Sequence, residues 1–170
     1  MVKNSDSSIS KTAKIQTMYK KIGKNVVISD NVLIVSNNLI IEDNVIIGSN
    51  TTIKGDFIKI GKNSEIGKNS NIKVIEKFEL GNRSLLCICE IKGRNVIIGD
   101  DFFSSVPKGN YLIVGGGSCY YPKSNLQIGN RCTIHDVYIN IAMPVKIGDD
   151  VGLSHETKIF THYFWDSIFE

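Results

Sequence analysis

Histidine is the residue type in this sequence best suited to general acid–base chemistry, because the pKa of a histidine side chain, ~6.5, lies close to neutral pH. The chain of 170 residues contains three histidines, His135, His155 and His162. His162 lies where a repetitive segment passes into a loop, and a side chain there is held in place and still reaches solvent. We therefore take His162 as the candidate general base, with an exposed loop histidine as the alternative interpretation.

The other candidate groups carry weaker signals. His135 follows an aliphatic residue of the repeat and His155 stands at the corner before the last strand, so we interpret both as corner residues; for His155 the alternative is a second, substrate-binding group. Trp165 offers a flat apolar ring on which a sugar could pack, or it covers the end of the repeat. No cluster of His, Cys, Asp and Glu has the spacing of metal ligands, so we predict no metal.

A repeat of six residues positions these groups. Ile22, Ile28 and Ile34 are six residues apart, and the next member, Ile41, follows after seven. The first members of successive triplets are Ile22, Ile41, Ile60, Leu80, Ile98, Ile128 and Ile147. A second set of small or β-branched residues stands four positions after each aliphatic residue. An α-helix would instead need apolar residues three and four apart, and a β-sandwich has no fixed lattice of six.

The positions between the aliphatic residues have the composition of chain corners. Glycine follows many of the aliphatic residues, and asparagine recurs at Asn25, Asn31, Asn37, Asn44, Asn50, Asn63 and Asn69. Glycine allows close approach of the backbone, and asparagine tolerates positive φ better than other residues with a side chain. The sequence thus predicts an all-β fold, a left-handed parallel β-helix of about seven coils with one inserted loop.

The repeat also divides the chain. Residues 1–20 precede the repeat, and we predict that they form an N-terminal cap or a solvated tail, although their lysines could touch a membrane surface. Residues 21–160 form the β-helix, with an inserted loop at 104–125 that contains Tyr120 and Tyr121. We expect these tyrosines to contact substrate or a neighbouring subunit, and a plain surface loop is the alternative.

Composition excludes several classes of function. A net charge of +3, without aromatic residues among the basic ones, does not indicate a nucleic-acid partner. No apolar run reaches the ~18 residues of a membrane span, so we expect no stable membrane insertion. The four cysteines lack C-x-x-C spacing, which favours free thiols and a cytoplasmic location.

The segment from Ile147 to Glu170, IGDDVGLSHETKIFTHYFWDSIFE, resembles part of the hexapeptide-repeat acyltransferases, and in particular the sugar O-acetyltransferases. In that family a coil runs into a Thr-His pair and an acceptor loop. The matching residues here are Thr161, His162, Trp165, Ser167 and Glu170. Residues 161–170 would accordingly be the start of an acceptor-type loop.

The resemblance implies acetyl transfer from acetyl-CoA to a sugar hydroxyl, in the modification of surface polysaccharide or lipopolysaccharide. His162 would remove the proton from the acceptor hydroxyl, and the protein would be a homotrimer. Family members have further coils after the acceptor loop that help to bind coenzyme A, so the sequence leaves open whether Glu170 is the natural end. Two alternatives stay open: a non-catalytic trimeric scaffold that lacks the donor site, and an amino-sugar N-acetyltransferase.

Overall fold

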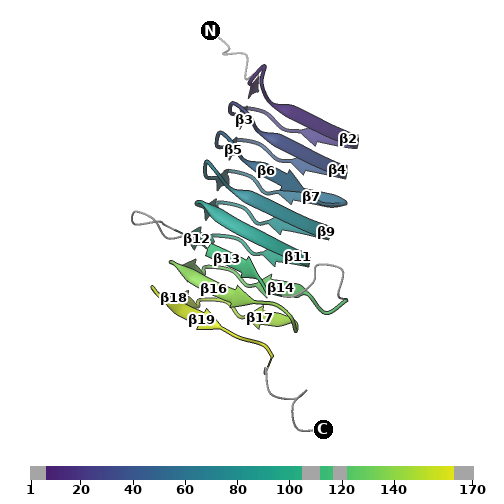
Figure 1. The fold of residues 1–170 in the computed structure, drawn as a ribbon. Coiled ribbons are helices and arrows are strands. Elements are labelled where there is room, and N and C mark those ends of the chain that lie inside the picture. The colour runs from purple at the N-terminus through teal and green to yellow at the C-terminus, as the bar shows by residue number, and fades with distance from the viewer. Residues whose placement is uncertain (1–6, 105–111, 117–121, 163–170) are drawn as a thin grey trace.

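The computed structural model describes residues 7–104, 112–116 and 122–162, and every regular element within them is a β-strand (Figure 1). The strands are β1 (Ser8–Ile9), β2 (Lys14–Ile22), β3 (Val27–Ile28), β4 (Leu33–Ile41), β5 (Ile46–Ile47), β6 (Thr52–Lys54), β7 (Phe57–Ile60), β8 (Glu65–Ile66), β9 (Asn71–Leu80), β10 (Leu85–Leu86), β11 (Cys89–Ile98), β12 (Phe103–Ser104), β13 (Leu112–Gly115), β14 (Asn125–Ile128), β15 (Thr133–Ile134), β16 (Val137–Asn140), β17 (Val145–Ile147), β18 (Gly152–Leu153) and β19 (Thr157–Ile159).

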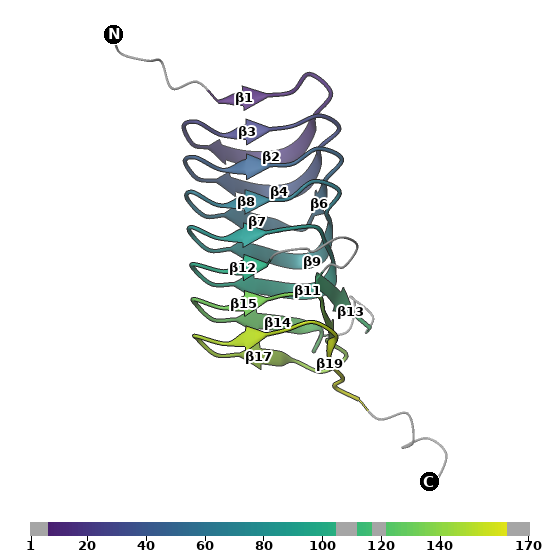
Figure 2. The ribbon, with the colours of Figure 1, turned by 90° about the vertical axis from the view of Figure 1, so that its left-hand side faces the viewer.

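These strands wind into stacked coils with three faces. The short strands form an eight-stranded sheet in the order β1-β3-β5-β8-β10-β12-β15-β18, and each pair in it is parallel (Figure 2). The second sheet forms the other two faces. The half that carries the candidate site, which we call the front face, contains β13, β16 and β19, and the half beside it contains β7, β14 and β17.

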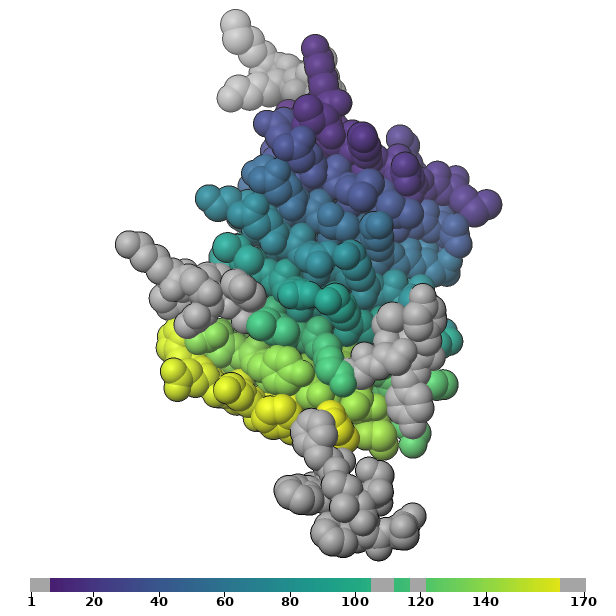
Figure 3. Space-filling view, in the orientation of Figure 1, coloured from purple at the N-terminus to yellow at the C-terminus, as the bar shows by residue number. Residues whose placement is uncertain are grey.

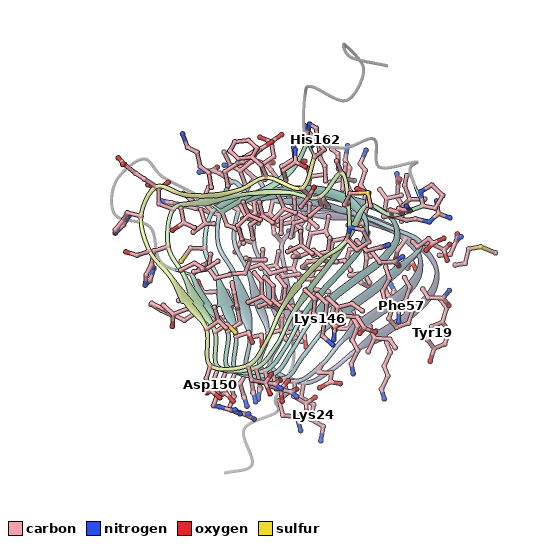
Figure 4. The ribbon with its side chains drawn as sticks, turned by 90° about the horizontal axis from the view of Figure 1, so that it is seen from below. Tyr19, Lys24, Phe57, Lys146, Asp150 and His162 are labelled. Carbon is pink, nitrogen blue, oxygen red and sulfur yellow. The ribbon has the colours of Figure 1, made fainter. Side chains whose placement is uncertain are left out.

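The coil is left-handed. In Figure 4, which views the molecule from below, the chain passes clockwise from Lys146 through Asp150 to His162 while it advances toward the viewer. The predicted fold class, an all-β left-handed parallel β-helix, is therefore confirmed.

The aliphatic residues of the repeat fill the inside of the coils. Ile28, Ile34 and Ile41 are at most 1% exposed, and the same holds for their counterparts through most of the stack. The second inward set includes buried hydroxyl groups, and these donate to carbonyl oxygens at the corners. Ser64 Oγ donates to Gly81 O at 2.7 Å, for example, so burying this hydroxyl leaves no donor without an acceptor.

Asparagine forms the corners, as predicted, at six of the seven positions. Asn25, Asn31, Asn44, Asn50, Asn63 and Asn69 have φ between 56° and 59°. Their amides also stack from coil to coil: Asn25 Nδ2 donates to Asn44 Oδ1 at 3.0 Å, and Asn44 Nδ2 donates to Asn63 Oδ1 at 2.8 Å. Asn37 is different, because its φ is not positive and its side chain donates to the carboxylate of Asp56.

The predicted N-terminal cap or tail is wrong for residues 7–20. Within this range β1 pairs with β3, and β2, which starts at Lys14, pairs with β4, so the range belongs to the first coil. Ile9 and Ile15 in fact continue the repeat, at spacings of six and then seven before Ile22. Lysines around them hid the pattern, because a terminal coil tolerates polar side chains at positions that are buried elsewhere.

The predicted single loop at 104–125 also needs correction. Leu112–Gly115 forms β13, which pairs with β11 on one side and β16 on the other. Leu112 and Val114 are 2% and 1% exposed because they occupy inward positions of a coil. The chain thus returns to the sheet between residues 105–111 and 117–121, two ranges that lie outside the described residues.

Candidate functional site

The candidate base His162 lies at the corner between the front face and the face of β14 and β17. It follows β19, the last strand of the described chain, and is partly exposed. Its Nδ1 lies 3.2 Å from Oδ1 of Asn140, the final residue of β16. The structure therefore gives His162 a specific side-chain partner, in the coil before its own.

Asn140 Oδ1 accepts from three groups. The backbone N–H of Ala142 donates to it at 3.0 Å and the hydroxyl of Thr161 at 2.9 Å, in addition to His162. The Thr161 hydroxyl in turn accepts from the backbone N–H of Met143 at 3.0 Å. The Thr-His pair is thereby tied to the preceding coil through one amide oxygen.

This arrangement fixes the tautomer of the neutral imidazole. A backbone N–H can only donate, so the Asn140 atom that faces Ala142 is the carbonyl oxygen of the amide. An oxygen that acts as an acceptor requires Nδ1 of His162 to carry the hydrogen. In the neutral ring the lone pair is then on Nε2, which is the form that a general base needs.

Burial of Asn140 is unusual for its place in the strand. The corresponding outward position holds Lys54, Lys73 and Lys92 in earlier coils, and all three lysines are exposed. Asn140, in contrast, is only 3% exposed. A polar side chain thus occupies a covered site on a face that otherwise carries solvated charge.

Gly116 contributes to this covering. Its φ is +85°, and a Cβ built on it would lie 2.1 Å from Asn140 Nδ2 and 2.7 Å from Tyr138 Oη. No other residue type fits there without displacing one of these side chains. The predicted loop therefore reaches the candidate site through a glycine of the described segment 112–116.

A surface pocket of about 590 Å³ lies on the front face, and Phe160, two residues before His162, is part of its lining. Within its lining the rings of Tyr138 and Phe160 pack against each other, tilted by 48° and with their centroids 5.7 Å apart. Asp136, Glu156 and Lys158 supply charged groups to the same lining. Two aromatic rings beside carboxylates form a surface of the kind on which a sugar packs its apolar side while its hydroxyls donate hydrogen bonds.

His135 and His155 come together at the other end of the front face. Their rings stack with centroids 6.1 Å apart, and Phe103 meets His135 edge-on at 5.6 Å. His155 Nδ1 lies 3.8 Å from a carboxylate oxygen of Asp136. Extended chain including β19 separates this cluster from His162 by roughly 20 Å, so the structure does not place His155 beside the candidate base.

The remaining predicted site residues, Trp165, Tyr120 and Tyr121, lie outside the described residues. The sequence pattern did not mark Asn140, Tyr138 or Phe160 as site residues. A faint signal for Asn140 existed, since it ends a strand-like run directly before the non-repeating stretch Ile141–Ala142–Met143–Pro144.

Two cysteines of the described chain, Cys87 and Cys89, are poor nucleophiles. Burial raises the pKa of the Cys89 thiol to about 12, and partial burial with the nearby Glu65 carboxylate raises the pKa of Cys87. Residues 7–104, 112–116 and 122–162 contain no group of three His, Cys, Asp or Glu side chains that could hold a metal ion. Of the groups in the described chain, His162 is thus our preferred candidate for acid–base chemistry.

Comparison with known proteins adds nothing to these observations. No protein-family model, no curated protein and no solved structure matches the chain. In the part that the structure describes, there is no helix of the length and apolarity needed to cross a lipid bilayer. A function for the chain must therefore be argued from the fold and from the geometry around His162.

Proposed function

We propose that this protein transfers an acetyl group from acetyl-CoA to a sugar hydroxyl, with His162 as the general base. One observation carries the proposal: a histidine in the expected Thr-His pair has its ring fixed by a buried amide, beside a pocket with two aromatic rings. The resemblance of residues 147–170 to sugar O-acetyltransferases supports the same chemistry.

In the proposed reaction Nε2 of His162 takes the proton of the acceptor hydroxyl as its oxygen attacks the thioester carbonyl carbon. Collapse of the tetrahedral intermediate breaks the carbon–sulfur bond, and the imidazolium returns the proton to the departing thiolate. Asn140 Oδ1 holds Nδ1–H throughout and stabilises the positive charge that develops on the ring. A positioned base of this kind contributes about 10²–10⁴-fold to a rate.

The acceptor in this proposal is a saccharide on the front face. Tyr138 and Phe160 would pack against the apolar side of a sugar ring. Following the resemblance, we propose surface polysaccharide or lipopolysaccharide as the source of this acceptor and a homotrimer as the active assembly.

The proposal is tested by incubating the protein with acetyl-CoA and a panel of hydroxyl and amino sugars, followed by mass spectrometry of the sugars. We expect acetylation of a hydroxyl, and a loss of at least about 100-fold in kcat for His162→Ala. The matched control is His155→Ala, which removes a histidine from the opposite corner and should retain most of the activity.

An unchanged rate in His162→Ala would show that the assignment of the base is wrong. Acetylation confined to amino groups would favour the N-acetyltransferase alternative. Calorimetry without acetyl-CoA binding, together with an intact trimer in sedimentation, would favour the scaffold.

A further inference from the structure

The end of the solenoid formed by β1 and β2 exposes part of the core. These two strands are the terminal strands of their sheets, and they lie at the upper end of the molecule in Figures 1 and 2. Inward positions of this coil have no described coil above them. Ile9 is accordingly 44% exposed, and Ala13, Ile15 and Ile22 are only partly buried.

Lysines surround this apolar end. Residues 7–29 contain no Asp or Glu and five lysines, all of them exposed: Lys11, Lys14, Lys20, Lys21 and Lys24. Their combined charge exceeds the net charge of the whole chain, +3, so the other residues together are net negative. The excess of positive charge therefore lies at the N-terminal end, which is drawn in purple in Figure 3.

In the described chain, the lysines at this end have no carboxylate partner, unlike four lysines of the later coils; the other described lysines of the later coils also form no ion pair. Lys59, Lys62, Lys77 and Lys92 each lie within 2.6–3.9 Å of a carboxylate oxygen. Among the described residues, none of the five lysines of the first coil forms such an ion pair. Their charge is thus available to an external anionic partner rather than compensated within the protein.

Apolar side chains stand among these lysines. Met18 is 87% exposed and Tyr19 is 56% exposed, and both lie between Lys14 and Lys20 on β2. Lys20 takes the register position that Leu39 holds in the next coil, which is an inward one, although the Lys20 side chain is exposed. Apolar and aromatic side chains interspersed with lysines match the boundary between lipid headgroups and acyl chains.

We propose that this N-terminal end binds the surface of a membrane that contains anionic lipids. The lysines contact the headgroups, while Met18, Tyr19 and Ile9 enter the interface. The phosphates of a nucleic acid would neutralise the lysines but would give Met18 and Ile9 no apolar partner. A membrane provides both kinds of contact, so we favour it as the partner. The inference is independent of the acetyl transfer proposed above.

The experiment is co-sedimentation of the full chain with phosphatidylcholine vesicles, with and without phosphatidylglycerol. We expect binding only to the anionic vesicles, and release at high salt. One variant carries Lys11→Gln, Lys14→Gln, Lys21→Gln and Lys24→Gln; its matched control carries Lys59→Gln, Lys62→Gln, Lys77→Gln and Lys92→Gln. Each lysine at a membrane surface is worth about fivefold in partitioning, so the first variant should lose at least about 100-fold and the control less than about fivefold.

A second variant distinguishes binding to a membrane from binding to other polyanions. Met18→Ser combined with Tyr19→Ser should weaken vesicle binding at least about tenfold, because two partly inserted side chains lose their apolar contact. Circular dichroism establishes that each variant is folded. Equal binding to neutral vesicles, or an equal loss in the control, would overturn the proposal. A further pair of results would also overturn it: the serine variant binds vesicles as well as the wild type does, and the wild type binds a single-stranded oligonucleotide more tightly than it binds vesicles.

Discussion

Replacement of Asn140 by alanine should destabilise the last described coil as well as remove the support of His162. The amide oxygen accepts from Ala142 N, Thr161 Oγ1 and His162 Nδ1, at 2.9–3.2 Å. Each such bond contributes about 1 kcal/mol net, so Asn140→Ala should lower the free energy of unfolding by about 3 kcal/mol. Burial of Asn140, at 3% exposure, argues against a smaller value, because water does not reach its position in the folded state.

Urea denaturation followed by circular dichroism measures this loss, and hydrogen exchange locates it. The amides of Ala142 and Met143 should exchange much faster in the variant, because the first loses its acceptor and the second loses the positioned hydroxyl of Thr161. Lys92→Ala is the matched control: it changes the corresponding outward position of an earlier coil, where the side chain is exposed. If Asn140→Ala cost no more than this control, the network around His162 would not be the stabilising element inferred here.

Two further predictions concern the corners and the buried thiol. Gly81→Ala should destabilise the protein by about 1–3 kcal/mol in thermal unfolding, because the new Cβ would lie 2.3 Å from the carbonyl carbon of Gly99. Gly148→Ala is the control and should be nearly neutral, because a Cβ at that position has no atom within 4 Å. Equal losses of stability in the two variants would refute the steric argument. Burial raises the pKa of Cys89 from 9.0 to about 12, so the folded state holds this proton longer than the unfolded state does, and stability should fall as the pH rises through this window. Cys89→Ala should show a shallower fall above pH 9 in parallel urea titrations, and an identical slope would contradict the assignment.

Much of the fold followed from the sequence because its signals are local. An aliphatic residue every six positions specifies which side chains point inward, and asparagine at positive φ specifies where the chain turns. Asn37 shows the limit of that logic, since the same residue type at a similar spacing pairs with Asp56 and does not adopt positive φ. The local preference of asparagine permits positive φ at this position, and contacts with the neighbouring coil determine whether the residue adopts it.

The first coil and β13 escaped prediction for related reasons. Ile9 and Ile15 keep the spacing of the repeat, but the polar residues of a terminal coil conceal it. Leu112 and Val114 are too short a run to show any period, and only their pairing with β11 and β16 identifies them as part of the coil. Parallel pairing between distant strands is not encoded in the few residues of one strand.

The sequence by itself determined the coil and singled out His162 as the histidine at its margin. The tertiary structure decided that Asn140, 22 residues earlier, holds the ring, and that His135 and His155 meet at the opposite corner. The physical reason lies in the register. Inward and outward positions repeat within each coil, whereas contacts between coils depend on how many residues each corner contains. Asn140 and His162 are 22 residues apart and His135 and His155 are 20 apart, and neither segment carries a local signal that identifies its partner.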